Sequence, residues 1–254
     1  MKLSSDWRDR VVFAYIDEPP FATPVSTGAA RGCDVDLALT GLRAIGVRAV
    51  ELRLTTFAEL LPGVASGRWT MNAPVFVSAE RQGIVSFSHP VWALGDGFVV
   101  SAGNPCGITS YRTIANGRRK LALVAGQIQR DHALAAGVTA EQIIEFATQH
   151  EALQAVRDGL ADAYASTALG NRTVLAHNRL VELMGVDAQD DFPRTPPIGA
   201  FSFAHASVDL RRAFDEFLVD YVGSIEHRER MLRNGLTSNE IDPIASWSRT
   251  AKDA

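Results

Sequence analysis

The stretch FAELLPGVASGRWTMNAPVFVSAERQGIVSFSHPVW, residues 57–92, contains the unit from which the fold can be predicted. Its first part carries apolar side chains at helical spacing, namely Phe57, Leu60, Leu61 and Val64. Gly67 follows as a helix terminator, and an apolar run up to Val77 indicates a buried strand. Ser78, a residue type that caps helices, then precedes Arg81 by one helical turn. This order predicts a helix, a core strand and a short helix that bears an arginine.

The same helix–glycine–strand unit returns in the second half of the chain. Leu61, Val64, Gly67 and Ala73 recur 92 positions later as Leu153, Val156, Gly159 and Ala165. A duplicated lobe and a chance match both explain four such pairs, and both interpretations stay open. Further strand-like runs, with helical patterns between them, lie at residues 11–16, 50–54, 120–126, 143–148 and 160–166. This alternation predicts parallel sheets covered by helices on both faces.

Local sequence signals predict the structural positions of two further residues, Asp34 and Trp69. Asp34 is of a type that caps helices, and apolar residues follow it at helical spacing. Trp69, in the run GRWTM, is expected inside a strand of the core.

The order of the remaining runs predicts two lobes. Residues 196–206 indicate a strand that is followed by a long amphipathic helix, so the chain returns to its first lobe. We expect lobe 1 to comprise residues 1–98 and 197–254, lobe 2 residues 103–192, and the connecting hinge segments residues 99–102 and 193–196. Gly103 and residues 193–197 are the expected hinge positions. Ligands of open α/β sheets bind beyond the carboxyl ends of strands, so a ligand cleft between the lobes is expected.

Composition excludes some classes of function. The chain has 254 residues, 46% of them apolar and 21% charged, with a net charge of −4 and no basic run. No nucleic acid or anionic membrane is therefore expected as a partner, and no apolar stretch reaches the length of a membrane span. The first residues, MKLSSDWRDR, lack the apolar region of a signal peptide, so either an export segment was removed or the protein stays in the cytosol. Cys33 and Cys106 are expected to be unpaired, and their spacing indicates no metal site.

A series of short motifs gives the sequence a family resemblance. In order they are IDEPPF (16–21), RGCDVDLA (31–38), FAELLPGVASGRWTM (57–71), SAER (78–81), VSFSHPVW (85–92), VAGQIQ (124–129) and DGLADAYAST (158–167). Over about residues 10 to 222 the chain resembles the bacterial extracellular solute-binding proteins of family 3, which are the polar-amino-acid receptors of ABC importers.

The resemblance implies an architecture and a set of partners. It implies the type II periplasmic-binding-protein fold, with two α/β lobes joined by two connecting strands and a ligand cleft that closes on a small solute. The implied partners are an amino-acid-like or other carboxylate ligand and a membrane permease. A monomer without cofactor or metal is expected. The implied location is the periplasm, with the cytoplasm as the alternative.

Arg81 is the residue to which the resemblance assigns the ligand's α-carboxylate. A helix start favours an anion, and the planar guanidinium matches a carboxylate in shape. A solvated surface arginine is the alternative that the spacing alone allows. Phe21 and Trp92, at turns where strands end, are expected as flat walls for an apolar or cationic part of the ligand, with core packing as the alternative.

Several positions depart from the family pattern. Pro74 and Phe76 stand where these receptors usually have small hydroxyl residues, so Phe76 is expected to line the ligand instead. The usual Gly-Thr-Thr or Gly-Ser-Thr turn of the second lobe appears as Gly126-Gln127-Ile128, with Gln129 at the following helix start. Thr167, beside Ser166, replaces an aspartate that usually pairs with the ligand's ammonium group. A hydroxyl group does not neutralise a buried ammonium charge.

Two interpretations of the missing aspartate stay open. The ligand lacks an ordinary α-ammonium group, or Glu18 supplies the negative charge, with Asp17 as its competitor. Acids before proline are also common in turns, which is the ordinary explanation for both residues.

Two other classes of function are weighed beside the importer receptor. One is a cytosolic small-molecule sensor or binding protein, which the missing signal peptide favours. The other is an enzyme similar to cyclohexadienyl dehydratase, in which Glu18, Thr167, His89 and His150 would be candidate acids and bases. No nucleophile–base pair is visible in the sequence, so no enzyme is expected.

Overall fold

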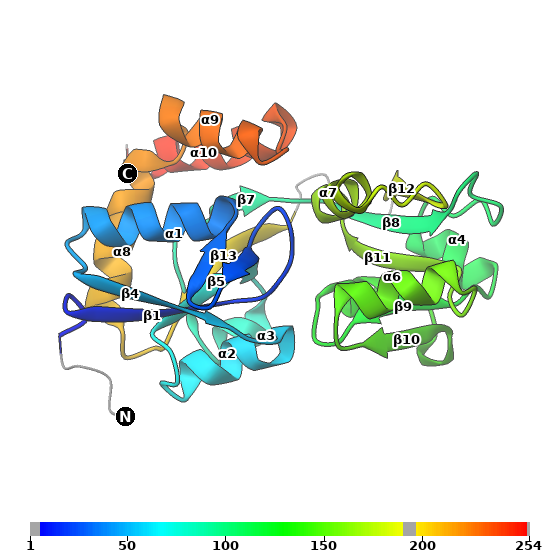
Figure 1. Cartoon of the computed structure of the whole chain (residues 1–254), viewed down its shortest axis with the longest axis horizontal. Helices are drawn as coiled ribbons and strands as arrows, with labels where there is room; N and C mark the ends of the chain where they lie inside the picture. Colours follow the sequence, from blue (N-terminus) through cyan, green and yellow to red (C-terminus); the bar gives the residue numbers. More distant parts are fainter. Residues whose placement is uncertain (1–5, 190–196, 253–254) are drawn as a thin grey trace. The chain divides into compact units, whose positions relative to one another are not determined.

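The apolar runs of the sequence form the strands of two separate sheets, each wrapped by helices (Figure 1). The computed structural model describes residues 6–189 and 197–252. The chain divides into unit 1, Met1–Ala93 with Pro197–Ala254, and unit 2, Leu94–Pro196. No helix in the described part of the chain is long and apolar enough to cross a membrane.

Unit 1 is built around a six-stranded mixed sheet. The strands follow the order β4-β1-β5-β13-β6, and β7 also pairs with β13. Strand β1 pairs in parallel with β4 and β5, whereas β13 is antiparallel to β5. The strands are β1 (Arg10–Tyr15), β4 (Ala49–Leu54), β5 (Met71–Phe76), β6 (Ser86–Phe87), β7 (Trp92–Ala93) and β13 (Ile198–Phe203), with a separate hairpin of β2 (Thr23–Ser26) and β3 (Ala29–Arg31).

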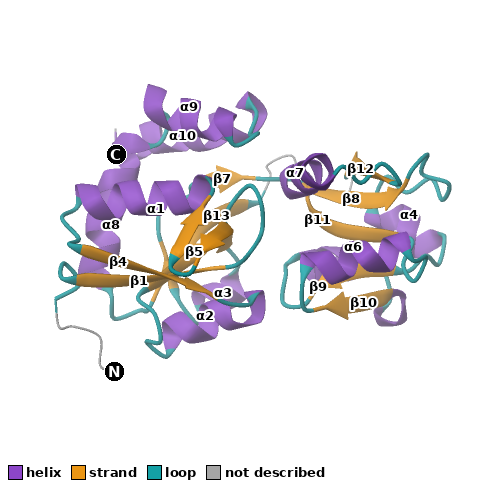
Figure 2. Cartoon of the chain, in the orientation of Figure 1, coloured by secondary structure: helices purple, strands orange, loops and turns teal. Residues whose placement is uncertain are grey.

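Helices lie on both faces of this sheet (Figure 2). Helix α1 follows β1 on one face, and α2 leads into β5 on the other (Figure 1). Helix α8 packs against α1, and the C-terminal helix α10 packs against α8, α9 and strand β7. Their bounds are α1 (Cys33–Ala44), α2 (Phe57–Ala65), α3 (Ala79–Gln82), α8 (Val208–Tyr221), α9 (Ile225–Arg233) and α10 (Ser238–Lys252).

Unit 2 has a five-stranded sheet in the order β10-β9-β11-β8-β12. The strands β9, β10 and β11 are parallel, whereas β8 is antiparallel to both of its neighbours. The core on one face includes Phe98, Tyr111 and Ala133, and α6 packs against the sheet. The elements are β8 (Asp96–Ser101), α4 (Tyr111–Asn116), β9 (Leu121–Val124), α5 (Gln129–Ala135), the 3-10 turn η1 (Ala140–Gln142), β10 (Ile143–Phe146), α6 (Gln149–Arg157), β11 (Ala163–Thr167), α7 (Ala168–Asn178) and β12 (Leu183–Asp187).

Three expectations about the strands differ from the structure. Both sheets are mixed rather than purely parallel, because β8 and β13 run against their neighbours. Residues 99–101, expected in a connecting segment, belong to β8, and the division between the units falls after Ala93. Trp69 lies in the turn before β5, although its ring is buried as expected and its Nε1 donates to the Leu60 carbonyl at 3.1 Å. The expected segment 193–196 lies outside the described residues.

The repeated unit of the sequence is a repeated unit of structure. Helices α2 and α6 have bounds that differ by 92 positions at both ends, and each leads into a buried strand, β5 or β11. Gly67 and Gly159 follow these helices with the same φ of +72°, a backbone conformation that L side chains avoid. The glycines are therefore needed to turn the chain from helix to strand.

We expect Gly159→Ala to lower the free energy of unfolding by about 1 kcal/mol, because the alanine would be held in the left-handed region. A Cβ at Gly159 would meet no atom within 4 Å, so backbone strain is the only cost. Gly95→Ala is the matched control, since its Cβ also meets open space and its φ lies outside the positive range. Urea midpoints measure the difference, and equal midpoints for the two variants would contradict this account.

Candidate functional site

The turn after β1 holds Glu18 and Phe21 in fixed positions. The Glu18 backbone N–H donates to the Ala22 carbonyl at 2.9 Å, and Phe21 N–H donates to the Glu18 carbonyl at 3.0 Å. The Glu18 side chain is half-buried, whereas the neighbouring Asp17 is exposed. Phe21 is buried and faces inward from the turn. The sequence IDEPPF thus forms a closed turn with an acid at its start and an aromatic ring at its end.

The first turn of helix α1 clamps this turn from the other side. The N–H groups of Cys33 and Asp34 donate to the carbonyls of Pro20 and Phe21, each at 3.0 Å. A Cβ on Gly32, whose φ is +133°, would lie 2.3 Å from the Phe21 carbonyl oxygen. Only glycine therefore allows this close approach, and Gly32 rather than Asp34 is the N-cap residue. The expectation that Asp34 caps the helix is wrong, because the close contact with Phe21 starts the helix earlier.

Three aromatic rings that the sequence singled out meet in unit 1. The ring centroids of Phe21 and Trp92 are 5.9 Å apart, and those of Phe76 and Trp92 are 5.0 Å apart in an edge-to-face arrangement. Each ring is less than one-tenth exposed. The indole lies over Gly199 of β13, where a Cβ would be 2.1 Å from ring carbons. The cluster is therefore a rigid apolar wall packed into the core of unit 1, and a contact of these rings with a ligand stays a prediction.

Arg81 lies next to this wall. Ser78 accepts a hydrogen bond from the Arg81 N–H at 3.2 Å, which confirms it as the cap of α3, but α3 is a single turn. The guanidinium donates to the Phe76 carbonyl at 2.8 Å and lies 5.6 Å from the Phe57 ring centroid. The arginine is thus half-buried and held at the end of β5. Phe57, which the sequence placed only on the core face of α2, is an additional neighbour that apolar periodicity alone does not distinguish.

Asp34, which the sequence indicates only as a helix cap, is a buried acid in this region. Its side chain is 1% exposed. Burial raises the pKa of Asp34 to about 8, since the charged form loses its hydration, and the negative charge of Glu18 adds to the rise. The interaction with the Cys33 thiol acts in the opposite direction and lowers the pKa. An acid is thus buried in the first turn of α1.

In unit 2, a buried carboxylate organises the loop that contains Gln127, Ile128 and Gln129. The amide of Gln129 donates to Asp96 at 3.0 Å, and the Tyr111 hydroxyl donates to the same carboxylate at 2.6 Å. His132 Nδ1 lies 2.8 Å from Asp96 Oδ2. The Gln129 amide nitrogen, which the sequence made available to a ligand, therefore holds Asp96. Gln127 is buried and Ile128 is half-buried beside it.

Ser166 and Thr167 end strand β11 at the same edge of the sheet. Thr167 accepts a hydrogen bond from Gly170 N–H at 3.0 Å and so caps helix α7. Ser166 is buried, and its Oγ has no hydrogen-bond partner within the described residues. Asp96 is the register partner of Thr167 across the antiparallel β11–β8 pair. A carboxylate thus lies opposite Thr167, the position at which the resemblance leads one to expect an aspartate. No local pattern predicts this neighbour, because the pairing is long-range.

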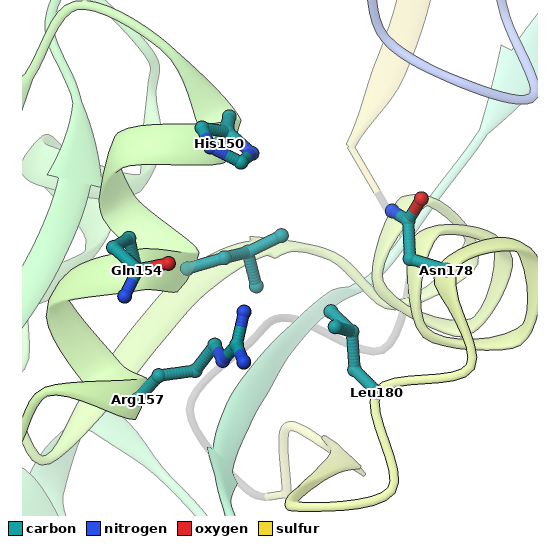
Figure 3. Close-up of a pocket in the computed structure, with 6 residues that line it drawn as sticks. His150, Gln154, Arg157, Asn178 and Leu180 are labelled. Carbon is teal, nitrogen blue, oxygen red and sulfur yellow. The ribbon is translucent and has the colours of Figure 1, made fainter.

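The two histidines considered as acid–base residues belong to other surroundings. His89 N–H donates to Asp215 Oδ1 at 2.7 Å and so fixes the loop before β7 to helix α8. His150 lines a pocket of about 200 Å³ in unit 2, together with Leu153, Gln154, Arg157, Asn178 and Leu180 (Figure 3). Arg157 at this pocket forms an ion pair with Glu182, with 2.8 Å between Nε and Oε1. Cys33 and Cys106 are unpaired, as expected.

Comparison with known proteins gives one family and one fold. Residues 11–231 match the family described as bacterial extracellular solute-binding proteins, family 3. The chain is 32% identical over 243 residues to a probable amino-acid ABC transporter periplasmic-binding protein, y4tE, of Sinorhizobium fredii (strain NBRC 101917 / NGR234). That alignment covers 93% of this chain and 80% of the relative.

Solved structures confirm the predicted type II periplasmic-binding-protein fold. The crystal structure of EhuB in complex with hydroxyectoine superposes with a TM-score of 0.83 at 23% identity, covering 94% of this chain and 95% of that one. An ancestral arginine-binding protein bound to arginine gives a TM-score of 0.77 at 21% identity, covering 91% and 100% of the two chains.

We expect Gly199→Ala to displace the Trp92 ring and to lower the free energy of unfolding by about 1–3 kcal/mol, as overpacking does in a filled core. Gly185→Ala is the control, because its Cβ would meet Leu175 at an ordinary 3.4 Å. Urea denaturation measures the stability, and near-ultraviolet circular dichroism reports the aromatic packing. An unchanged aromatic spectrum for Gly199→Ala would show that Trp92 is not held as described.

Proposed function

We propose that this chain, which belongs to the bacterial extracellular solute-binding proteins of family 3, is the substrate-binding receptor of an ABC importer for a small carboxylate-bearing solute. The observation that carries the proposal is the placement of Arg81, half-buried at the end of β5 beside an aromatic wall. The similar Sinorhizobium protein, named as a periplasmic-binding protein of an amino-acid ABC transporter, supports an importer and a membrane permease as partner. It also supports a location in the periplasm.

Arg81 is the group that holds the solute's carboxylate. Its Nη1 is anchored on the Phe76 carbonyl, so the guanidinium plane is oriented before a ligand arrives. The Phe57 ring lies 5.6 Å from the guanidinium carbon and limits water on that side. A pre-oriented guanidinium loses little rotamer freedom on binding, and its planar donors match the two oxygens of a carboxylate.

Glu18 is the group that we assign to the positive end of the solute. It stands at the start of the turn whose other end carries Phe21, and Phe21 contacts the Trp92 ring. A carboxylate next to aromatic rings suits a cation whose charge is spread over several atoms. Hydroxyectoine, the ligand of one similar structure, combines a carboxylate with a delocalised cation and has no ordinary α-ammonium group, whereas arginine, the ligand of the other, carries both kinds of cation. A zwitterion of the first kind fits a chain in which threonine stands at position 167.

The second unit contributes polar groups from the edge at which β9 and β11 end. We assign contacts with the solute to the Thr167 hydroxyl, to Ser166 and to the loop at Gln127 and Ile128, while Gln129 supports that loop through Asp96. A solute that interacts with groups of both units favours the closed over the open arrangement of the two lobes. The permease would then recognise the closed receptor.

Arg81→Ala should weaken binding of carboxylate solutes by about 2–5 kcal/mol, roughly 30-fold to several thousandfold, because a desolvated carboxylate would lose its partner. Isothermal calorimetry with hydroxyectoine and arginine, after a thermal-shift screen of amino acids, cyclic zwitterions and hydroxy acids, measures the change. Arg68→Ala is the matched control, because Arg68 also stacks on an aromatic ring but is exposed. Equal affinities of the wild type and Arg81→Ala would refute the assignment.

Glu18→Gln should weaken binding of solutes that carry a cation by about 10- to 100-fold and leave glycolate, a carboxylate without a cation, unchanged. The glutamine keeps the size of the side chain and removes only its charge. Asp17→Asn serves as the control, since Asp17 is the exposed neighbour in the same turn. If both classes of solute lose affinity equally, Glu18 does not act as the counter-charge.

A further inference from the structure

A pocket between helices α6 and α7 takes no part in the proposed function. Its volume is about 200 Å³, and all of its lining residues belong to unit 2. A pocket of this size is too small for a drug-sized ligand and suits a solute of a few heavy atoms. We call it the α6–α7 pocket, and its lining residues are His150, Leu153, Gln154, Arg157, Asn178 and Leu180 (Figure 3).

Helical spacing and one left-handed residue bring these side chains together. On α6, His150 is followed by lining residues at i+3, i+4 and i+7, which share one side of a helix. On the other wall, α7 ends at Asn178, and Arg179 follows with a φ of +51°. This left-handed cap turns the chain back, and the Leu180 N–H donates to the Leu175 carbonyl at 3.3 Å. Leu180 therefore faces α6 across the pocket (Figure 3).

Two polar side chains of α6 are oriented by acids that lie outside the pocket lining. Gln154 Nε2 donates to Asp158 Oδ1 at 2.8 Å, which leaves the amide oxygen on the side of the pocket (Figure 3). Arg157 Nε lies 2.8 Å from Glu182 Oε1, while the terminal guanidinium nitrogens point into the pocket (Figure 3). Gln154 thus offers an acceptor, and Arg157 offers charged donors.

The remaining lining residues complete a pattern that one kind of solute matches. Asn178 presents its amide across the pocket from Arg157 (Figure 3), so both can donate to one carboxylate. A hydroxyl group on the solute can donate to the Gln154 oxygen. Leu153 is 4% exposed, and with Leu180 it gives the pocket an apolar surface for a short alkyl chain.

We propose that the α6–α7 pocket is a second solute site, separate from the Arg81 site, for a small 2-hydroxycarboxylate with a short branched alkyl chain. Arg157 and Asn178 hold the carboxylate, and Gln154 accepts from the hydroxyl. The ion pair between Arg157 and Glu182 does not prevent this, because side chains that are 41% and 43% exposed form a weak pair that an incoming anion can share. The proposal does not depend on the proposed function.

The probe for this site is 2-hydroxyisovalerate, added to the full-length protein labelled with ¹⁵N. We expect a saturable shift of the Asn178 side-chain amide signal, with a Kd on the order of 1 mM. Isovalerate, which lacks the hydroxyl, should bind about three- to tenfold more weakly, and the uncharged 2-hydroxyisovaleramide more weakly by about tenfold or more. A signal that does not move in a saturable way up to about 50 mM of the hydroxy acid, far above the expected Kd, would overturn the proposal.

Three variants test the assigned contacts. Arg157→Gln should weaken binding of 2-hydroxyisovalerate about tenfold or more, and Glu182→Gln should tighten it about three- to fivefold by removing a nearby negative charge. Gln154→Met should bring the affinity for the hydroxy acid down to that for isovalerate. Arg130→Gln is the matched control and should keep the wild-type Kd, because Arg130 forms a similarly exposed ion pair with Glu145 in unit 2, outside the pocket lining.

The Arg81→Ala variant separates this proposal from the proposed function. An Asn178 shift that persists in Arg81→Ala and disappears in Arg157→Gln would support the second site, whether or not Arg81 binds a solute. A shift that disappears in Arg81→Ala would show that the hydroxy acid acts through the Arg81 site, and would overturn the second site. Equal Kd values for the wild type and Arg157→Gln would also overturn it, and the proposed function would still stand.

Discussion

The close contact between the start of helix α1 and the turn at Pro20 and Phe21 is the constraint on which the candidate site depends. Gly32 allows it, since any Cβ would collide with the Phe21 carbonyl oxygen. Two main-chain hydrogen bonds then fix the turn, and through it the positions of Glu18 and Phe21. The same helix start carries the buried Asp34. The backbone contact between the helix start and the turn therefore sets Glu18, Phe21 and a buried carboxyl in one region of unit 1.

The polar groups of the two units are organised by different means. In unit 1 main-chain groups hold the polar residues in place. The Arg81 guanidinium donates to the Phe76 carbonyl, and Glu18 is held by hydrogen bonds within its turn. In unit 2 the buried carboxylate of Asp96 collects hydrogen bonds from Tyr111 and Gln129 and contacts His132. Buried polar networks of this kind give rigid loops, because every bonded member fixes its neighbours. In the proposed site both arrangements hold groups in place before a solute arrives, which limits the entropy lost on binding.

The local features of the fold could be predicted from the sequence, and the long-range features could not. Helical spacing and Gly67 or Gly159 define the repeated unit, because both signals act within a few residues. The antiparallel place of β8 depends on partners far along the chain, so local patterns assign residues 99–102 to a connecting segment instead. Local rules favour Asp34 at a helix cap, whereas in the structure it is buried and its main chain bonds to the turn at Phe21. Arg81 is singled out by the order of motifs rather than by its spacing, and its contact with a ligand stays a prediction.

Strand β7 lies where the chain passes between the two units. It consists of Trp92 and Ala93, directly before the chain leaves unit 1, and it pairs with β13 directly after the chain returns. The Trp92 indole therefore lies over Gly199, close to both points at which the chain passes between the units. The ring of Trp92 and the two points at which the chain passes between the units therefore belong to one pair of strands.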